Sequence, residues 1–82
     1  MPTKAHRVDE YQPLPGILLA MRGDAGLTQR ALAERLDRPQ SWVHNCERGD
    51  RRVDVAEFVA WCRACGHSPR TALDRYLRVL GA

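Results

Sequence analysis

Helix-start and helix-stop residues divide this chain into short segments, and each segment carries apolar residues at helical spacing. The first segment has apolar residues at positions i, i+3, i+4 and i+7, namely Leu14, Ile17, Leu18 and Met21. This period is typical of an amphipathic helix. Pro13 and Pro15 suit the first turn of such a helix. Because glycine is favoured just beyond a helix end, we expect Gly23 and Gly26 to end it.

The same signals predict four further helices. Asp54 is a candidate N-cap, and Glu57 three residues later completes a capping-box pattern. The other expected helix starts are at Thr28, Pro39 and Ser68–Pro69. No segment alternates apolar and polar residues in the manner of a half-buried strand. We therefore predict an all-α fold of five short helices.

Length and composition limit the chain to one small domain. It has 82 residues, of which 44% are hydrophobic and 28% charged, values typical of a soluble globular protein. We predict a polar, flexible N-terminal arm over residues 1–12 and a single domain over residues 13–82. The chain has no apolar stretch long enough to span a membrane and no apolar signal segment. Together with an odd number of cysteines, this favours a cytoplasmic protein without disulfides.

The charge of the chain is mildly basic. The net charge is +3, and 12 of the 13 basic residues are Arg. Arg suits phosphate and guanine because its planar guanidinium donates in pairs. This excess favours nucleic acid as a partner only modestly, since net charge alone says little about function.

The segment PQSWVHNCER combines two different faces on one helix. Successive helical residues advance by about 100°, which places Trp42, Val43 and Cys46 together on an apolar face. The opposite face consists of hydrogen-bonding side chains, namely Gln40, Ser41, His44, Asn45 and Arg48. Gln and Asn pair with adenine, Arg prefers guanine, and Ser binds either base. This face predicts contact with DNA bases; the alternative is a solvated face that lacks Lys and Glu.

Four motifs follow one another between residues 14 and 66. They are R-x-x-x-G-L-T-Q, L-A-E-R-L, P-Q-S-W-V and E-R-G-x-R-R-x-D. In this order and spacing they resemble the helix-turn-helix repressors of the Cro and lambda-repressor type, the XRE family. The resemblance implies a compact five-helix, lambda-repressor-like DNA-binding domain. It further implies a transcriptional regulator, a repressor that binds double-stranded DNA at a palindromic operator as a homodimer.

The resemblance also implies roles for individual residues. Thr28 to Leu36 would be the scaffold helix and Pro39 to Arg48 the recognition helix in the major groove. The implied base contacts are Gln40, Ser41, His44 and Asn45. The implied phosphate contacts are Gln29, Arg38, Arg48, Arg51 and Arg52. Arg22 and Glu47 match a pair that forms a structural salt bridge between the first and third helices.

The sequence departs from the family pattern at several positions. Asp37 occupies the turn position where the family usually has a left-handed Gly, a conformation that Asp tolerates better than most residues. His44 and Asn45 replace the Ser and Lys of close relatives, so the base preference is not transferable. Cys46 and Cys65 replace larger core residues.

The spacing Cys62-Arg-Ala-Cys65 permits two readings. With His44, Cys46 or His67 as further ligands it would suit a zinc or redox site, although a structural zinc site needs four ligands. The cysteines also continue the apolar stripe of Val55, Phe58 and Val59, and free Cys behaves as a small buried hydrophobe. We favour core packing and expect no metal and no cofactor.

An enzyme and a protein-binding module are the two other function classes. The sequence has no phosphate-binding glycine loop, nucleophile elbow or carboxylate pair, so we expect no enzyme. The last helix carries Leu73, Tyr76, Leu77 and Leu80, which would cover the domain's own core or form a dimer surface. An antitoxin or adaptor that binds a protein partner is therefore the alternative function. In the N-terminal arm, Lys4, His6 and Arg7 would enter a minor groove or remain a disordered terminus.

Overall fold

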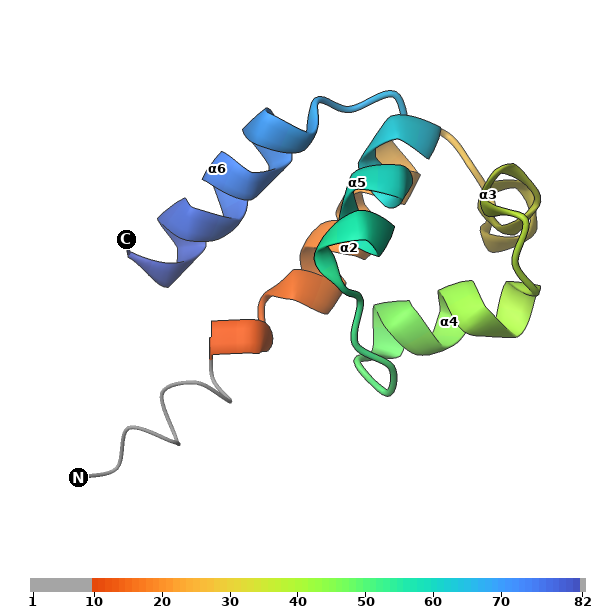
Figure 1. The fold of residues 1–82 in the computed structure, drawn as a ribbon, viewed down its shortest axis with the longest axis horizontal. Coiled ribbons are helices and arrows are strands. Elements are labelled where there is room, and N and C mark those ends of the chain that lie inside the picture. Colours follow the sequence, from red (N-terminus) through yellow and green to blue (C-terminus); the bar gives the residue numbers. More distant parts are fainter. Residues whose placement is uncertain (1–9, 82) are drawn as a thin grey trace.

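The computed structural model describes residues 10–81, and within that range it contains five α-helices and no strand (Figure 1). The helices, labelled as in Figure 1, are α2 (Leu14–Asp24), α3 (Gln29–Leu36), α4 (Gln40–Arg48), α5 (Val55–Ala64) and α6 (Pro69–Leu80). The all-α, five-helix prediction is confirmed. The predicted arm contacts at Lys4, His6 and Arg7 lie outside the described residues.

The predicted capping residues begin three of the helices. Thr28 accepts a hydrogen bond from the Ala31 amide at 3.0 Å. Asp54 and Glu57 form both bonds of the predicted capping box. Ser68 caps α6 in the same way. These side chains satisfy amide groups that would otherwise have no partner at a helix start.

Two turn positions decide how α2 and α3 end. Gly23 lies inside α2, which continues to Asp24, so only Gly26 acts as the predicted stop, with φ of 71°. After α3, Asp37 adopts the left-handed conformation, with φ of 56° and ψ of 46°. The left-handed turn expected at Asp37 is therefore confirmed. This sharp turn brings α4 directly across α3.

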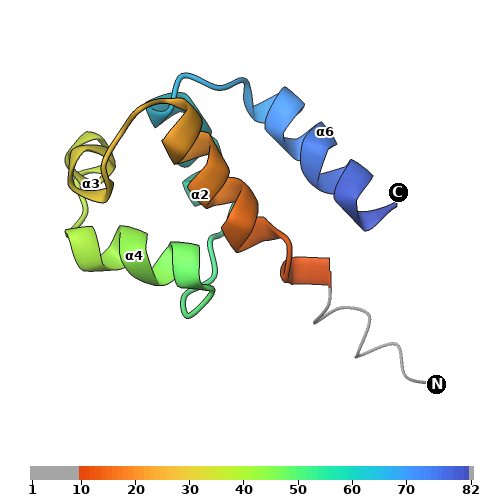
Figure 2. The same cartoon turned by 180° about the vertical axis from the view of Figure 1, so that it is seen from behind.

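The core lies between α2, α3, α4 and α5, which pack around one another (Figure 2). Its fully buried side chains are Leu18, Met21, Leu32, Val43, Cys46, Trp61 and Cys62. Trp61 also donates a hydrogen bond from its indole Nε1 to the Leu18 carbonyl at 3.1 Å. Cys46, Cys62 and Cys65 are all buried free thiols in this core. The apolar face of α4 predicted this for Cys46, and the apolar stripe of α5 predicted it for Cys62 and Cys65.

The last helix is only partly covered by the domain. It packs on α5, and in both ribbon views it lies on the far side of the molecule from α3 and α4 (Figures 1 and 2). Ala72 is buried, but Leu73, Leu77 and Val79 are 47%, 39% and 57% exposed. On α5, the apolar stripe was predicted to begin at Val55, but this side chain is 79% exposed, so the prediction placed the start of the buried face one turn too early.

Glu10 and Tyr11, just before α2, are both bonded to the domain. Tyr11 lies against the core, and its hydroxyl accepts a hydrogen bond from the Val53 amide at 3.0 Å. The Tyr76 hydroxyl on α6 donates to the Glu10 carbonyl. The end of the predicted arm is thus held by one contact to the loop before α5 and one contact to α6.

Candidate nucleic-acid interface

One side of α4 is open to solvent and carries only hydrogen-bonding side chains. Val43 and Cys46 are fully buried, and Trp42 is half-buried against the core. The exposed side, called the recognition face below, consists of Gln40, Ser41, His44, Asn45 and Arg48. The predicted separation of an apolar and a polar face on this helix is therefore present in the structure.

An ion pair between α2 and α4 holds the recognition helix in place. Arg22 donates from Nε to Glu47 Oε2 at 2.6 Å and from Nη2 to Oε1 at 3.1 Å. Arg22 also donates to the Leu27 carbonyl at 2.8 Å. The Glu47 side chain is 2% exposed and that of Arg22 is 18% exposed. The hydrogen bond to Glu47 raises the pKa of Arg22.

The first residue of α3 joins the same network. Gln29 donates from Nε2 to Glu47 Oε1 at 2.9 Å. The family resemblance implied a phosphate contact for Gln29 and gave no sign of this bond. No local signal would have found it, because its two residues are 18 positions apart. One proton of the Gln29 amide group stays available, since the group has two donors.

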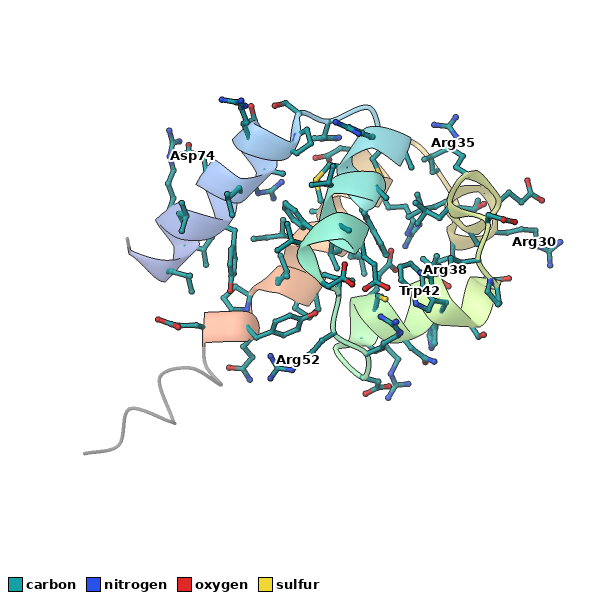
Figure 3. The ribbon with its side chains drawn as sticks, viewed as in Figure 1. Arg30, Arg35, Arg38, Trp42, Arg52 and Asp74 are labelled. Atoms are coloured by element: carbon teal, nitrogen blue, oxygen red, sulfur yellow. The ribbon has the colours of Figure 1, made fainter. Side chains whose placement is uncertain are left out.

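A second cluster lies at the other edge of α4, around the Trp42 ring. The Arg38 guanidinium lies 4.5 Å and the Arg51 guanidinium 5.2 Å from the ring centroid. Both arginines are bonded to Glu57 at the start of α5. Figure 3 shows Arg38 beside Trp42, while Arg30 of α3 points away from the domain.

The remaining predicted phosphate contacts flank the end of α4. Arg48 pairs with Asp50 at 3.3 Å, and both side chains are mostly exposed. The Arg52 guanidinium lies 4.4 Å from the centroid of the Tyr11 ring. Of the predicted phosphate contacts, Arg48 thus lies on the recognition face itself, at the last residue of α4. The others border this helix, on α3 and on the two loops before and after α4, namely Gln29, Arg38, Arg51 and Arg52.

Comparisons with known proteins agree with this geometry. A helix-turn-helix domain family matches residues 17–76. The XRE-family like protein from Pseudomonas syringae pv. tomato str. DC3000 is 42% identical, with a TM-score of 0.86 over 95% of each chain. No curated protein matches the chain. The chain belongs to the XRE family of helix-turn-helix proteins. This XRE-family protein is a DNA-binding regulator, and its fold is one that typically carries no enzymatic activity.

In the XRE-family protein, the starts of α3 and α4 differ from the start of α5 in the acidic side chains that they carry. Neither α3 nor α4 has an acidic residue in its first turn, and Pro39 gives α4 no side-chain cap. The first amides of α4 are therefore open to an acceptor from outside the chain. The start of α5 is instead occupied by Asp54 and Glu57. Because a helix start attracts anions, the starts of α3 and α4, which border the recognition face, suit a phosphate better than the start of α5 does.

The three cysteines of the XRE-family protein lie in its core as protonated thiols. Among residues 10–81, no group of three His, Cys, Asp or Glu side chains is placed to hold a metal ion. Burial raises the pKa of the Cys62 thiol to about 11 and raises those of Cys46 and Cys65. A protonated thiol is a poor metal ligand and a poor nucleophile.

Among residues 10–81, none of the helices has the length and hydropathy that a membrane span requires.

Proposed function

We propose that the chain is a repressor that binds a palindromic DNA operator as a homodimer, with α4 in the major groove. The recognition face supports this proposal most directly. It offers amide, hydroxyl, imidazole and guanidinium groups at the surface of a helix whose opposite side is fixed in the core. Such groups read base edges in the major groove, and the groove admits one helix.

The proposed contacts divide into two sets. Base edges are contacted by Gln40, Ser41, His44 and Asn45. Phosphates are contacted by Gln29, Arg38, Arg48, Arg51 and Arg52. The second set lies around the first, which suits a division in which phosphate contacts fix the register and base contacts carry the sequence information.

The exposed apolar side of α6 supports the homodimer. Leu73 and Leu77 lie one turn apart on α6 and are large apolar residues exposed to solvent. Leu73 also lines an apolar groove between α5 and α6. A second copy packed there would remove this surface from water. Two recognition helices in one dimer would then lie about one helical turn apart on DNA, ~34–36 Å.

In vitro selection from a random duplex library tests the proposal. The wild-type chain is expected to enrich an inverted repeat, and footprinting is expected to protect both half-sites. Sedimentation of the DNA complex is expected to show two chains per duplex. Enrichment of no sequence, or protection of one half-site at saturation, would contradict the proposal.

A protein partner on α6 defines the second candidate, an antitoxin or adaptor whose DNA binding serves autoregulation. The same exposed apolar residues favour it. It differs in one measurable respect from the homodimer. An adaptor stays monomeric on DNA until its partner is added, whereas the homodimer needs nothing beyond a second copy.

A further inference from the structure

Glu57 forms more bonds than its role as a helix cap requires. Its Oε1 accepts from the Asp54 amide at 2.9 Å, which completes the capping box. Arg51 donates to both carboxylate oxygens, from Nη1 and Nη2, at 3.2 Å each. Arg38 donates to Oε2 at 3.3 Å. The bonds from Asp54 and Arg51 hold the pKa of Glu57 below its ordinary value.

These bonds connect both ends of the recognition helix. Arg38 lies in the turn before α4, and Arg51 lies in the loop after it. Between them is Trp42 of α4, whose ring has one guanidinium at 4.5 Å and another at 5.2 Å. A single carboxylate on α5 therefore joins two cations, called the arginine pair below, that border the recognition face. Arg51 also donates to the Arg52 carbonyl at 2.7 Å, whereas the bond to Glu57 is what connects it to Arg38.

Trp42 contributes its ring face and not its polar group. Its indole Nε1 is buried and has no hydrogen-bond partner among the described residues. A buried Trp usually pairs this group, as Trp61 does with the Leu18 carbonyl. The interaction that Trp42 does make is with the arginine pair, since guanidinium groups bind favourably over aromatic faces.

The arginine pair is held but not shielded from solvent. The side chains of Arg38 and Arg51 are 40% and 41% exposed, against 14% for Glu57. Their outer donors can reach a phosphate while their orientation stays fixed. Free arginines would instead follow phosphates in any register, because phosphate attraction is independent of sequence.

We propose that Glu57 is a specificity-determining residue of the DNA interface. It fixes the arginine pair so that both arginines contact phosphates only when the recognition face is in register with its base sequence. The inference rests on the proposed DNA contacts of Arg38 and Arg51. Glu57 itself touches no DNA in this arrangement; it acts as a positioning residue.

The test compares two variants that make the same change in charge. E57Q keeps a side-chain oxygen for the capping box, since Gln is accepted at this position, but it loses the ionic bonds to the arginine pair. D54N also raises the net charge by one unit and keeps a favoured N-cap. Asp54 makes no ion pair among the described residues, so D54N leaves the arginine pair held.

Affinity is measured for a duplex selected by the wild-type chain and for a scrambled duplex of the same length and composition. Each added phosphate contact strengthens binding about eightfold at roughly 0.1 M salt and steepens the salt slope by about 0.9. E57Q is therefore expected to bind the scrambled duplex more tightly, with a steeper salt slope. Its ratio of selected to scrambled affinity is expected to fall about tenfold, because register then depends less on the phosphate contacts.

A third variant separates position from charge. E57D keeps the charge but shortens the side chain, so it is expected to lower the affinity ratio without a change in net charge. D54N is expected to stay within about twofold of the wild-type ratio, since its phosphate contacts keep their register. Thermal melting of each variant confirms that the assays use folded protein.

Three results would overturn the inference. They are a wild-type ratio in E57Q, a wild-type ratio in E57D, or a loss in D54N as large as that in E57Q. Failure of the wild-type chain to select any sequence is a different result, because it contradicts the proposed function itself.

Discussion

Gln29 and Glu47 are joined by a hydrogen bond of 2.9 Å, which fastens the first residue of α3 to the last turn of the recognition helix. Glu47 also accepts both bonds of the Arg22 guanidinium. One carboxylate therefore fixes the angle between the two helices of the helix-turn-helix and their distance from α2. Its side chain is only 2% exposed, so the carboxylate is almost completely removed from solvent.

The losses of stability from removing Arg22 and Glu47 singly are expected to add up to more than the loss from removing both together. R22M leaves the Glu47 carboxylate buried without its cation, and breaking a buried pair in this way costs about 3–5 kcal/mol. The double variant R22M/E47Q leaves no such charge. Urea unfolding of both single variants and the double variant measures the coupling, and strictly additive losses would mean that the pair contributes nothing.

Truncation on the recognition face is expected to change base preference. N45A and Q40A are each expected to weaken binding to the selected duplex by about 1–3 kcal/mol and to relax the preference at one base pair. E34Q, on the exposed side of α3, serves as a control outside the face. Binding titrations against single-base variants of the duplex measure the effect. Unchanged preference in both alanine variants would contradict the assignment of α4.

Arg52 is expected to contribute equally to the affinity for every duplex, whatever its base sequence. R52A is expected to weaken binding to selected and scrambled duplexes by the same factor and to lower the salt slope by about one. The reason is that a phosphate contact carries no base information. Titrations at several salt concentrations measure the slope. A loss confined to one base pair would instead identify Arg52 as a base contact.

The two tryptophans are expected to respond differently to the same substitution. W61F removes a buried hydrogen bond and leaves the Leu18 carbonyl without that donor, which costs about 1–3 kcal/mol before any loss of packing. W42F removes an indole donor that has no partner among the described residues, so it is expected to cost less than W61F. Thermal or urea unfolding of the two variants decides the order. Equal losses would show that packing alone determines both.

The buried thiols give stability a dependence on alkaline pH. Burial raises the pKa of Cys62 to about 11, above the value of about 8.5 for a free Cys. The pKa of this thiol is higher in the folded state than in the unfolded state. Its contribution to the free energy of unfolding is therefore complete below about pH 8.5 and is lost as the pH rises toward 11. Unfolding curves at pH 7, 9 and 10 measure this loss. Thiol labelling at pH 8 is expected to require unfolding, and fast labelling of the folded chain would contradict the burial.

The sequence predicted those features that depend on neighbouring residues. Thr28, Asp54 and Ser68 identified three helix starts because a cap acts within its own helix turn. The left-handed turn at Asp37 followed from one position in the family pattern. The recognition face followed from helical periodicity alone, and burial confirmed its orientation.

Other features depend on contacts between distant segments, and the sequence did not predict them. Glu57 was identified as a cap, while its bonds to Arg38 and Arg51 depend on how α5 packs beside α4. The bond from Gln29 to Glu47 depends on the angle of the helix pair. The stripe on α5 was extended too far toward Val55, because periodicity marks the direction of a face and not where its neighbour ends.

Two tyrosines would link the proposed DNA contact of Arg52 to the proposed dimer surface on α6. Tyr76 of α6 is bonded to the Glu10 carbonyl, and the adjacent Tyr11 bonds Val53 and lies against Arg52. If a second copy on α6 displaced Tyr76, the effect would pass through Glu10 and the adjacent Tyr11 to Arg52. Linkage makes such an effect reciprocal. Whatever factor dimerisation adds to operator affinity, the operator must add to the strength of the dimer.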